Sequence, residues 1–399
     1  MRSGQKNPIR LLFLINSLRV SGTEVLMFSL AQELTRKGCE VYLFPLITPF
    51  DQGFKEYLKS KGSFNVVFPP VVERFDAFFW RINGLTQRIF GWSFRSYFLR
   101  RYLSSQWKKH RFDVVVSNTY PADILAVEWM KEIKSRLVVV DHGAYCNFLA
   151  TDQPFDPVAL QAANVVVAVS QWAKAIISRR FPDLDIKVIY NGHSGLTTTG
   201  QSHWFTSRLR ESSHLTFCIH GRSSPQKGFD IAVEAYQQVK AQGYKIRLLI
   251  LSEGELIDQL KLQHQQDPDI IFGGFIYNLG DVLPDVYAGL VLSKKSESFG
   301  LSVLDYFSAG RPVVASGVGG IPEVIRKDAI IGGILIDATP DGVAPVDEVA
   351  KAMIRLIDDA EFYQTCRNAA ARILQEYSMK NCSEKYFDLF QDLVRRTIN

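Results

Sequence analysis

The chain contains 399 residues, and at roughly 150 residues per domain this length predicts two to three domains. Hydrophobic residues make up 47% of the chain and charged residues 22%, a composition that excludes an intrinsically disordered protein. The net charge of +5 does not by itself indicate nucleic-acid binding, so we expect no nucleic-acid partner.

Two features bear on the cellular compartment. The five cysteines form neither a CxxC motif nor a Cys/His pair at zinc spacing, which favours reduced thiols and no metal site. The apolar run at residues 11–15 is too short for a signal-peptide core or a membrane span, and we interpret it as a buried strand. The sequence therefore predicts a cytoplasmic protein.

Short apolar segments alternate with amphipathic helical patterns along the chain. In the first half, the predicted strands are residues 11–15, 41–45, 114–117, 137–141 and 165–169. In the second half, they are residues 216–220, 247–251, 270–272, 289–292, 313–315 and 333–336. Helical patterns lie between them, for example at residues 24–37 and 230–241. The strands lack strict polar–apolar alternation, which is typical of parallel strands covered on both faces.

This order predicts an α/β fold of two Rossmann-like, doubly wound domains that bind ligands beyond the carboxyl ends of their strands. The turn dipeptide Asn191-Gly192 and the Ser/Thr/Gly-rich stretch after it mark the break. We expect an N-terminal domain over residues 1–195 and a C-terminal domain over residues 196–378. Residues 379–399 are expected to form a helix that packs back on the N-terminal domain.

Residues 74–111 differ from the rest of the chain, because they contain nine Lys or Arg, one Asp and eleven aromatic residues. One interpretation is that ordinary helices pack these aromatics inward and leave the arginines in water. The other is that the segment docks on an anionic membrane surface, with aromatics at the interface and cations toward the headgroups. Both interpretations stay open, and the second implies peripheral association with the inner face of the membrane.

The loop after the predicted strand at residues 216–220 carries two cations. Arg222 can bind a diphosphate through a forked pair of hydrogen bonds, and Lys227 can bind it as a point charge. The helix that begins after Gly228 adds the partial positive charge of its N-terminus. This loop is therefore a candidate diphosphate site.

A second set of polar residues follows the predicted strand at residues 289–292. Glu297 lies in the next loop, and Asp305 lies eight residues later in a helix. Both carboxylates can accept hydrogen bonds from sugar hydroxyls, and the backbone N–H groups at the helix start can bind anions or hydroxyls. The glycine-rich residues 317–320 predict a backbone turn that approaches the ligand closely.

Taken together, these motifs resemble those of the retaining family 4 glycosyltransferases of GT-B fold, in which two Rossmann-like domains face each other across a cleft. The segments that carry the resemblance are Ser21-Gly22-Thr23-Glu24, Val169-Ser170-Gln171-Trp172, Ile189-Tyr190-Asn191-Gly192, Gly221-Arg222 with Lys227-Gly228, Phe272-Gly273-Gly274-Phe275, Glu297 with Asp305, and Gly319-Gly320-Ile321-Pro322-Glu323.

The resemblance implies a catalytic set of Arg222, Lys227, Glu297 and His142. Arg222 and Lys227 would neutralise the diphosphate leaving group of a nucleotide sugar. Glu297 would hold the sugar hydroxyls, and His142 would contact the sugar near the reacting carbon. The remaining donor contacts would come from Gly22 in the loop over the phosphates, from the backbone near Phe275 and Ile276 at the base, from the amides of Phe299, Gly300 and Leu301, and from Asp305 at the ribose.

The resemblance also implies a metal-independent reaction that uses no cofactor and retains the anomeric configuration. The acceptor would be a glycan or a lipid-linked molecule bound by the N-terminal half, in the synthesis of cell-surface polysaccharide or glycolipid. Three positions depart from the family pattern. Asp305 stands where Glu is usual, Ser21 stands where Gly is common, and His193 lies near a position that is often acidic.

Three other functions remain as alternatives. A nucleotide-sugar epimerase could use the same fold, but it would need no acceptor. A non-catalytic protein that binds a membrane or a partner would fit Ser21 and Asp305 as signs of a decayed site. An NAD-dependent dehydrogenase is disfavoured, because the first strand is followed by no GxGxxG motif.

Overall fold

The computed structural model describes residues 8–17, 22–47, 65–67, 94–211 and 213–396. The chain divides into two compact units, which are described separately. The first comprises Met1–Val169, Ala173–Gly192 and Met379–Asn399, and the second comprises Ser170–Trp172 and His193–Ser378. The expected domain boundary at residue 195 lies three residues beyond the division observed after Gly192.

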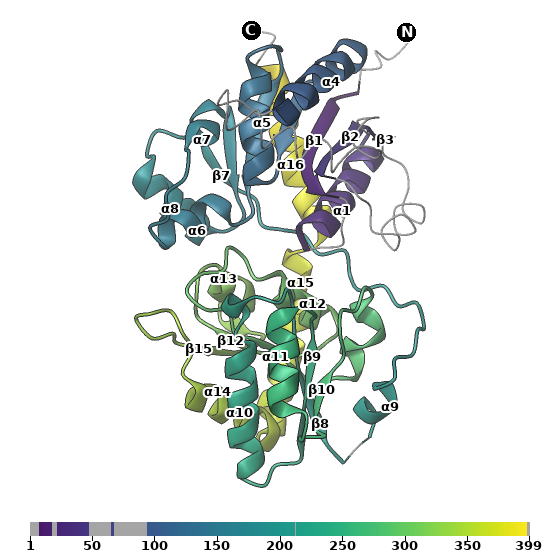
Figure 1. Ribbon diagram of the computed structural model, residues 1–399, viewed down its shortest axis with the longest axis vertical. Coiled ribbons are helices and arrows are strands. Elements are labelled where there is room, and N and C mark those ends of the chain that lie inside the picture. Colours follow the sequence, from purple (N-terminus) through teal and green to yellow (C-terminus); the bar gives the residue numbers. More distant parts are fainter. Residues whose placement is uncertain (1–7, 18–21, 48–64, 68–93, 212, 397–399) are drawn as a thin grey trace. The chain divides into compact units, whose positions relative to one another are not determined.

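The first unit is built on a seven-stranded parallel sheet of order β3-β2-β1-β4-β5-β6-β7 (Figure 1). Its strands are β1 (Arg10–Ser17), β2 (Glu40–Ile47), β3 (Asn65–Val66), β4 (Val114–Ser117), β5 (Arg136–Asp141), β6 (Val165–Ala168) and β7 (Ile186–Val188). Its helices are α1 (Gly22–Arg36), α4 (Phe94–His110), α5 (Tyr120–Met130), α6 (Ala144–Ala150), α7 (Val158–Ala162), α8 (Gln171–Arg180, from Ala173 onward) and α16 (Met379–Arg395).

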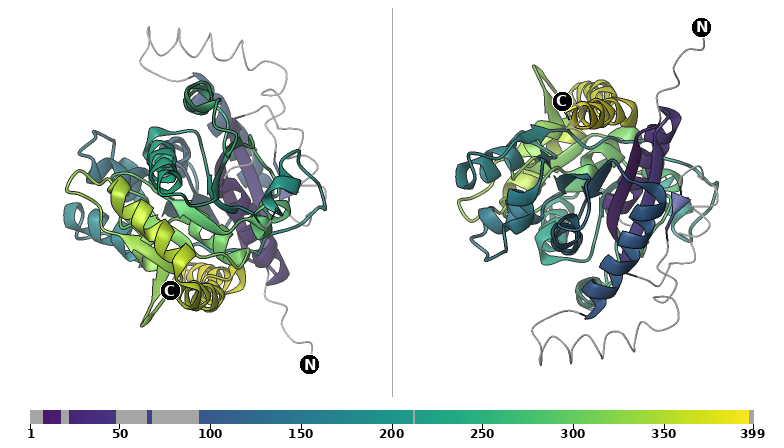
Figure 2. Two further views of the ribbon diagram at one scale, coloured as in Figure 1. Left: turned by 90° about the horizontal axis from the view of Figure 1, so that it is seen from below. Right: turned by 90° about the horizontal axis from the view of Figure 1, so that it is seen from above.

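The helices of the first unit cover both faces of this sheet. From β1 the chain adds β2 on one side of the sheet, and from β4 it adds β5 on the other side. Because both connections are right-handed crossovers, their helices α1 and α5 lie on opposite faces. The C-terminal helix α16 packs beside α1, and α4 packs beside α5. Figure 2 shows α4 and α16 on opposite sides of β1 and β2. Because both faces are covered, the described core residues of β1, β4 and β5 are almost fully buried.

The second unit repeats this architecture with a six-stranded parallel sheet of order β10-β9-β8-β11-β12-β15. Its strands are β8 (Leu215–His220), β9 (Ile246–Leu251), β10 (Ile270–Phe272), β11 (Ala288–Val291), β12 (Val313–Ser316) and β15 (Gly333–Ile336), with an antiparallel pair of β13 (Arg326–Lys327) and β14 (Ile330–Ile331). Its helices are α9 (Thr206–Leu209), η1 (Pro225–Lys227), α10 (Phe229–Ala241), α11 (Glu255–His264), η2 (Leu279–Asp281), η3 (Leu283–Asp285), α12 (Leu301–Ser308), α13 (Ile321–Ile325), α14 (Val346–Asp358) and α15 (Ala360–Glu376).

The expectation of two Rossmann-like, doubly wound sheets is confirmed, and the strand order places a switch point in each sheet. In the second unit α10 follows β8 and α12 follows β11, on opposite faces of the sheet. The carboxyl ends of β8 and β11 therefore meet where the order reverses, which is where such sheets bind ligands. Helix α14 packs on α10 and α15 packs on α12, which closes both faces.

The basic segment at residues 74–111 is described only from residue 94 onward, so three of its arginines, Arg74, Arg81 and Arg88, lie outside the described residues. In α4, Leu99 and Leu103 are buried, and Arg100 lies 3.5 Å from Glu128 and 3.8 Å from Glu132. Arg101, Lys108 and Lys109 are exposed. One face of α4 therefore packs inward through its leucines, while another carries cations in water and Tyr97 is 47% exposed, so both interpretations of the segment stay open.

Candidate functional site

The candidate site begins at the carboxyl end of β8, where the chain leaves the sheet through Gly221 and Arg222. The 3-10 helix η1 follows, and the Ser224 hydroxyl accepts a hydrogen bond from the Gln226 amide, 3.3 Å away. Gly228 has φ +71°, and a Cβ there would lie 2.1 Å from the Leu292 carbonyl oxygen. Only glycine fits this close approach, which joins the β8 loop to the end of β11.

Lys227 and Glu297 meet where these two loops come together. The Lys227 ammonium lies 2.6 Å from Glu297 Oε2, and the Ser293 hydroxyl donates to the same oxygen at 2.9 Å. Burial raises the pKa of the Glu297 carboxyl, but Lys227, Ser293 and Arg222 outweigh this effect and hold the pKa below its ordinary value. Glu297 is therefore ionised at neutral pH. Since both hydrogen bonds end on Oε2, Oε1 is the oxygen that the described contacts leave for a ligand.

The backbone of Glu297 is fixed by the glycine-rich turn at residues 317–320. The Gly320 amide donates to the Glu297 carbonyl at 2.8 Å. Gly319 has φ +60°, and a Cβ there would lie 2.0 Å from that same carbonyl oxygen. Gly319 thus lies against the backbone of Glu297, and the predicted approach of this turn to a ligand stays a prediction. Its glycines therefore set the position of the carboxylate.

Helix α12 starts at Leu301, four residues after Glu297. Gly300 is its N-cap residue and has φ +97°, and Phe299 and Gly300 are buried. The amides of Phe299, Gly300 and Leu301 thus belong to the positive end of a helix beside Glu297, as the motif predicted. Asp305 follows one turn further along α12.

Asp305 lies between two histidines. His193 Nε2 lies 3.1 Å from Asp305 Oδ1, and His220 Nε2 lies 3.6 Å from Oδ2. Burial raises the pKa of the Asp305 carboxyl, but the hydrogen bond from His193 and the charge interactions with both histidines outweigh it and lower the pKa. The sequence did not single out this cluster.

The predicted base contacts follow β10. Phe275 is 39% exposed and Tyr277 is 50% exposed, and their rings meet edge to face with centroids 5.0 Å apart. Ile276 lies half-buried between them. Their exposure makes these rings available to a ligand, but no described contact joins them to Glu297 or Lys227.

Two predicted site residues belong to the first unit. Gly22 is the exposed first residue of α1, and Ser21 before it lies outside the described residues. His142 follows β5, and its Nε2 lies 3.4 Å from Asn118 Oδ1. Asn118 directs its amide nitrogen at the carbonyls of Leu14 and Val116, so its oxygen faces the imidazole. Burial lowers the pKa of His142 to about 4, which keeps the ring neutral at physiological pH.

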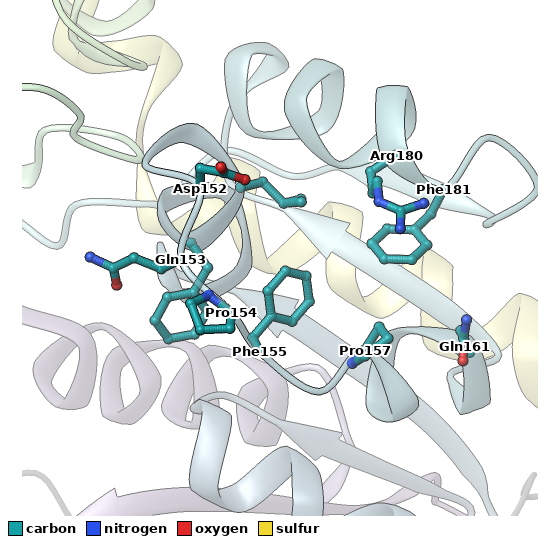
Figure 3. A pocket seen from close by; sticks show the side chains of 10 residues that line it. Asp152, Gln153, Pro154, Phe155, Pro157, Gln161, Arg180 and Phe181 are labelled. Atoms are coloured by element: carbon teal, nitrogen blue, oxygen red, sulfur yellow. The ribbon is translucent and has the colours of Figure 1, made fainter.

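A hollow of about 450 Å³ lies elsewhere in the first unit, between α6, α7 and the end of α8 (Figure 3). Phe148 stacks on Phe155 with ring centroids 5.7 Å apart, and Phe155 meets Phe181 edge to face. Figure 3 shows the Arg180 guanidinium above the Phe181 ring, 5.5 Å from its centroid. None of the predicted site residues lines this hollow.

Comparison with known proteins identifies the family of this chain. Residues 214–359 match the family model described as glycosyl transferases group 1, and residues 20–194 match the model of glycosyltransferase family 4. The chain belongs to the family 4 glycosyltransferases of GT-B fold. The resemblance inferred from the motifs is thereby confirmed.

Curated relatives are distant in sequence. The chain is 22% identical over 398 residues to an N-acetyl-alpha-D-glucosaminyl L-malate synthase of Bacillus anthracis, covering 94% of this chain and 95% of that enzyme. It is 23% identical over 254 residues to a lipopolysaccharide 1,2-N-acetylglucosaminetransferase of Salmonella typhimurium, covering 58% of this chain and 63% of that enzyme. An uncharacterised glycosyltransferase of Methanocaldococcus jannaschii is 26% identical over 247 residues, which cover 57% of this chain and 59% of that protein. With these last two relatives, the match spans less than two thirds of their length.

Solved structures share the fold. HepE of Anabaena, solved in complex with UDP and glucose, has a TM-score of 0.74 and 19% identity, covering 96% of this chain and all of that one. The pneumococcal O-GlcNAc transferase GtfA, solved with UDP and GlcNAc, has a TM-score of 0.69 and 12% identity, covering 98% of this chain and all of that one.

Proposed function

We propose that this protein is a retaining, metal-independent glycosyltransferase that transfers a sugar from a uridine diphosphate sugar to a glycan or lipid-linked acceptor. The observation that carries the proposal is the 2.6 Å contact between Lys227 and Glu297 at the switch point of the second sheet. It puts a cation suited to a diphosphate next to a carboxylate suited to sugar hydroxyls. Uridine is the proposed base because HepE and GtfA were solved with UDP.

In the proposed reaction, the bond between the anomeric carbon and the diphosphate oxygen breaks and its electron pair goes to the diphosphate. The acceptor oxygen bonds to the same carbon on the same face, and its proton passes to the departing phosphate oxygen. Lys227, Arg222 and the N-terminus of α12 stabilise the negative charge that develops on the leaving group. Glu297 orients the sugar.

No divalent ion is needed in this scheme, because the cations and helix dipoles carry the charge compensation. Within the described ranges, no group of three or more His, Cys, Asp or Glu side chains could hold a metal ion. The proposal of metal independence rests on the two cations rather than on that absence.

We place the acceptor on the first unit and propose a role in the synthesis of cell-surface polysaccharide or glycolipid. The exposed cations Arg101, Lys108 and Lys109 on α4 would hold the protein at an anionic membrane surface, near a lipid-linked acceptor. No helix in the part of the chain that the structure describes is long and apolar enough to span a membrane.

The proposal is tested by incubating the purified protein with UDP-, GDP- and ADP-hexoses, with EDTA present, and following thermal stabilisation and product formation by proton NMR. We expect UDP-sugars to raise the melting temperature of the protein. The protein should also cleave them to UDP and a sugar product that initially has the anomeric configuration of the donor. An epimerised donor formed without acceptor would instead establish the epimerase. Failure of every nucleotide sugar to bind would overturn the proposal.

A further inference from the structure

Each carboxylate oxygen of Asp305 faces the imidazole of a histidine. His193 lies on the Oδ1 side at 3.1 Å and His220 on the Oδ2 side at 3.6 Å. The side chains of His193, Asp305 and His220 are 11%, 22% and 8% exposed. The carboxylate is thus the member of the cluster that a ligand reaches, and the two imidazoles lie behind it.

The proton positions on His193 follow from its neighbours. The Gly195 amide donates to His193 Nδ1 at 3.0 Å, so Nδ1 presents a lone pair. A neutral ring then carries its proton on Nε2 and donates it to Asp305 Oδ1. The His193 amide also donates to the Tyr377 carbonyl at 2.7 Å, which fixes the backbone that holds this ring.

One ring nitrogen of His220, Nε2, makes no hydrogen bond within the part of the chain that the structure describes. Its Nε2 is buried and has no hydrogen-bond partner among the described residues, because 3.6 Å to Asp305 Oδ2 is too long for a hydrogen bond. The ring is held by packing against Tyr306, with centroids 5.0 Å apart, and the Tyr306 hydroxyl donates to the Cys218 carbonyl. A buried nitrogen left without a hydrogen-bond partner destabilises a fold, so its presence at the last position of β8 calls for a function.

Asp305 is one methylene shorter than the Glu that the family pattern places there, and a shorter side chain needs firmer support to present an oxygen at a set point. We infer that His193 and His220 are positioning residues that hold Asp305 as the acceptor of a ribose hydroxyl in the donor nucleotide. His193 orients the carboxylate through Oδ1. His220 faces the other carboxylate oxygen, with its Nε2 3.6 Å from Oδ2, and limits where that oxygen can turn. The inference rests on the proposed function and adds the two histidines to it.

The test is calorimetric binding of UDP, 2′-deoxy-UDP and 3′-deoxy-UDP to the full chain. We expect the wild type to prefer UDP by about tenfold or more over at least one deoxy analogue, the loss of one charge-assisted hydrogen bond. His193→Ala should reduce this preference to below about threefold, and His193→Gln, which keeps a side-chain N–H, should restore much of it.

His220→Phe separates positioning from folding. Phenylalanine keeps the ring that packs on Tyr306 and removes the unpaired nitrogen, so the melting temperature should stay equal or rise. The preference for ribose should nevertheless fall, which a purely structural role for His220 does not predict.

The outcomes distinguish the inference from the proposed function. If the wild type binds no UDP, the proposed function fails and the inference fails with it. If UDP binds and Asp305→Asn loses the ribose preference while the histidine variants keep it, only the role of the histidines is overturned. Retention of the preference by Asp305→Asn would also overturn the inference, since Asp305 would then not hold the ribose.

Discussion

The Lys227 ammonium and the Glu297 carboxylate, which lie 70 residues apart in the chain, are 2.6 Å apart in space. Their side chains are 23% and 21% exposed, so water screens the pair only in part. The Lys227 ammonium stabilises the ionised form of Glu297. When a diphosphate binds, the same ammonium can contact it instead. The consequences of this pair can be measured.

Lys227→Ala should weaken UDP binding by about 10- to 100-fold, because one charge-assisted hydrogen bond to a phosphate contributes about 1.5–3 kcal/mol. Isothermal titration calorimetry measures this loss. Lys294→Ala is the matched control, since Lys294 lies in the β11 loop and is ion-paired with Asp230. Equal losses in both variants would show that only net charge matters.

Gly319→Ala should displace Glu297. The added Cβ would lie 2.0 Å from the Glu297 carbonyl oxygen, at a φ of +60° that already disfavours alanine. We expect transfer activity to fall by about 100-fold or more, since misplacement of about 1 Å has that effect on a catalytic group.

Gly243→Ala serves as the control for backbone strain. Gly243 has φ +91°, but a Cβ there meets nothing within 4 Å. This variant should lose about 1–2 kcal/mol of stability from the left-handed backbone and keep its activity. If Gly319→Ala lost stability to the same extent and stayed active, the close approach to Glu297 would have no catalytic meaning.

Asp123 makes the first unit sensitive to pH. It is 1% exposed and accepts hydrogen bonds from the Ser117 hydroxyl at 2.5 Å and the Tyr145 hydroxyl at 2.8 Å. Burial raises the pKa of Asp123 to about 7, helped by the charge of Asp141 and opposed by those two hydrogen bonds. The unfolded-state pKa is about 4, so the folded state keeps a proton that the unfolded state loses. This stabilisation is complete below pH 4 and is lost as the pH rises through 7.

Asp123→Asn should therefore flatten the pH dependence of unfolding between pH 4 and 8 and stabilise the protein at pH 8 by up to about 4 kcal/mol. The amide can donate to Tyr145 and still accept from Ser117. Thermal unfolding across this pH range measures the effect, and Asp183→Asn, at an exposed acid of the same unit, should leave the slope unchanged. A wild-type slope in Asp123→Asn would show that another group titrates.

The exposed cations of α4 provide a test of membrane association. Vesicles rich in phosphatidylglycerol should retain the wild type at low salt and release it as salt rises. Replacing Arg101, Lys108 and Lys109 by Glu should abolish retention. Replacing the exposed Lys245, Lys261 and Arg372 of the second unit by Glu changes the net charge equally and should leave retention intact. Continued sedimentation of the α4 variant with vesicles would show that this face is not the anchor.

Periodicity in the sequence was enough to predict most of the two sheets, because long apolar strands such as β1 and β9 leave a clear signal. The short edge strands β3 and β7 were missed, since two or three residues carry no pattern. The family resemblance also placed Lys227 and Glu297 in one site, because each follows the carboxyl end of a predicted strand.

Contacts between side chains far apart in the sequence leave no comparable pattern in the sequence. His193 and Asp305 are separated by 112 residues, and only the folded chain shows that the two unusual residues meet. Likewise, a glycine in the sequence indicates that the backbone can be approached closely, but only the folded chain shows that Gly319 lies against the backbone of Glu297.

The most direct measurement of the central claim compares Glu297→Gln with the wild type in the turnover of a UDP-sugar and in the affinity for UDP. Glutamine keeps the shape of the side chain but removes the charge that Lys227 holds in place. We expect turnover to fall by about 100-fold, or about 2.7 kcal/mol, while the Kd for UDP changes by less than about threefold. Unchanged turnover in Glu297→Gln would contradict the assignment of this loop as the sugar-binding part of the active site.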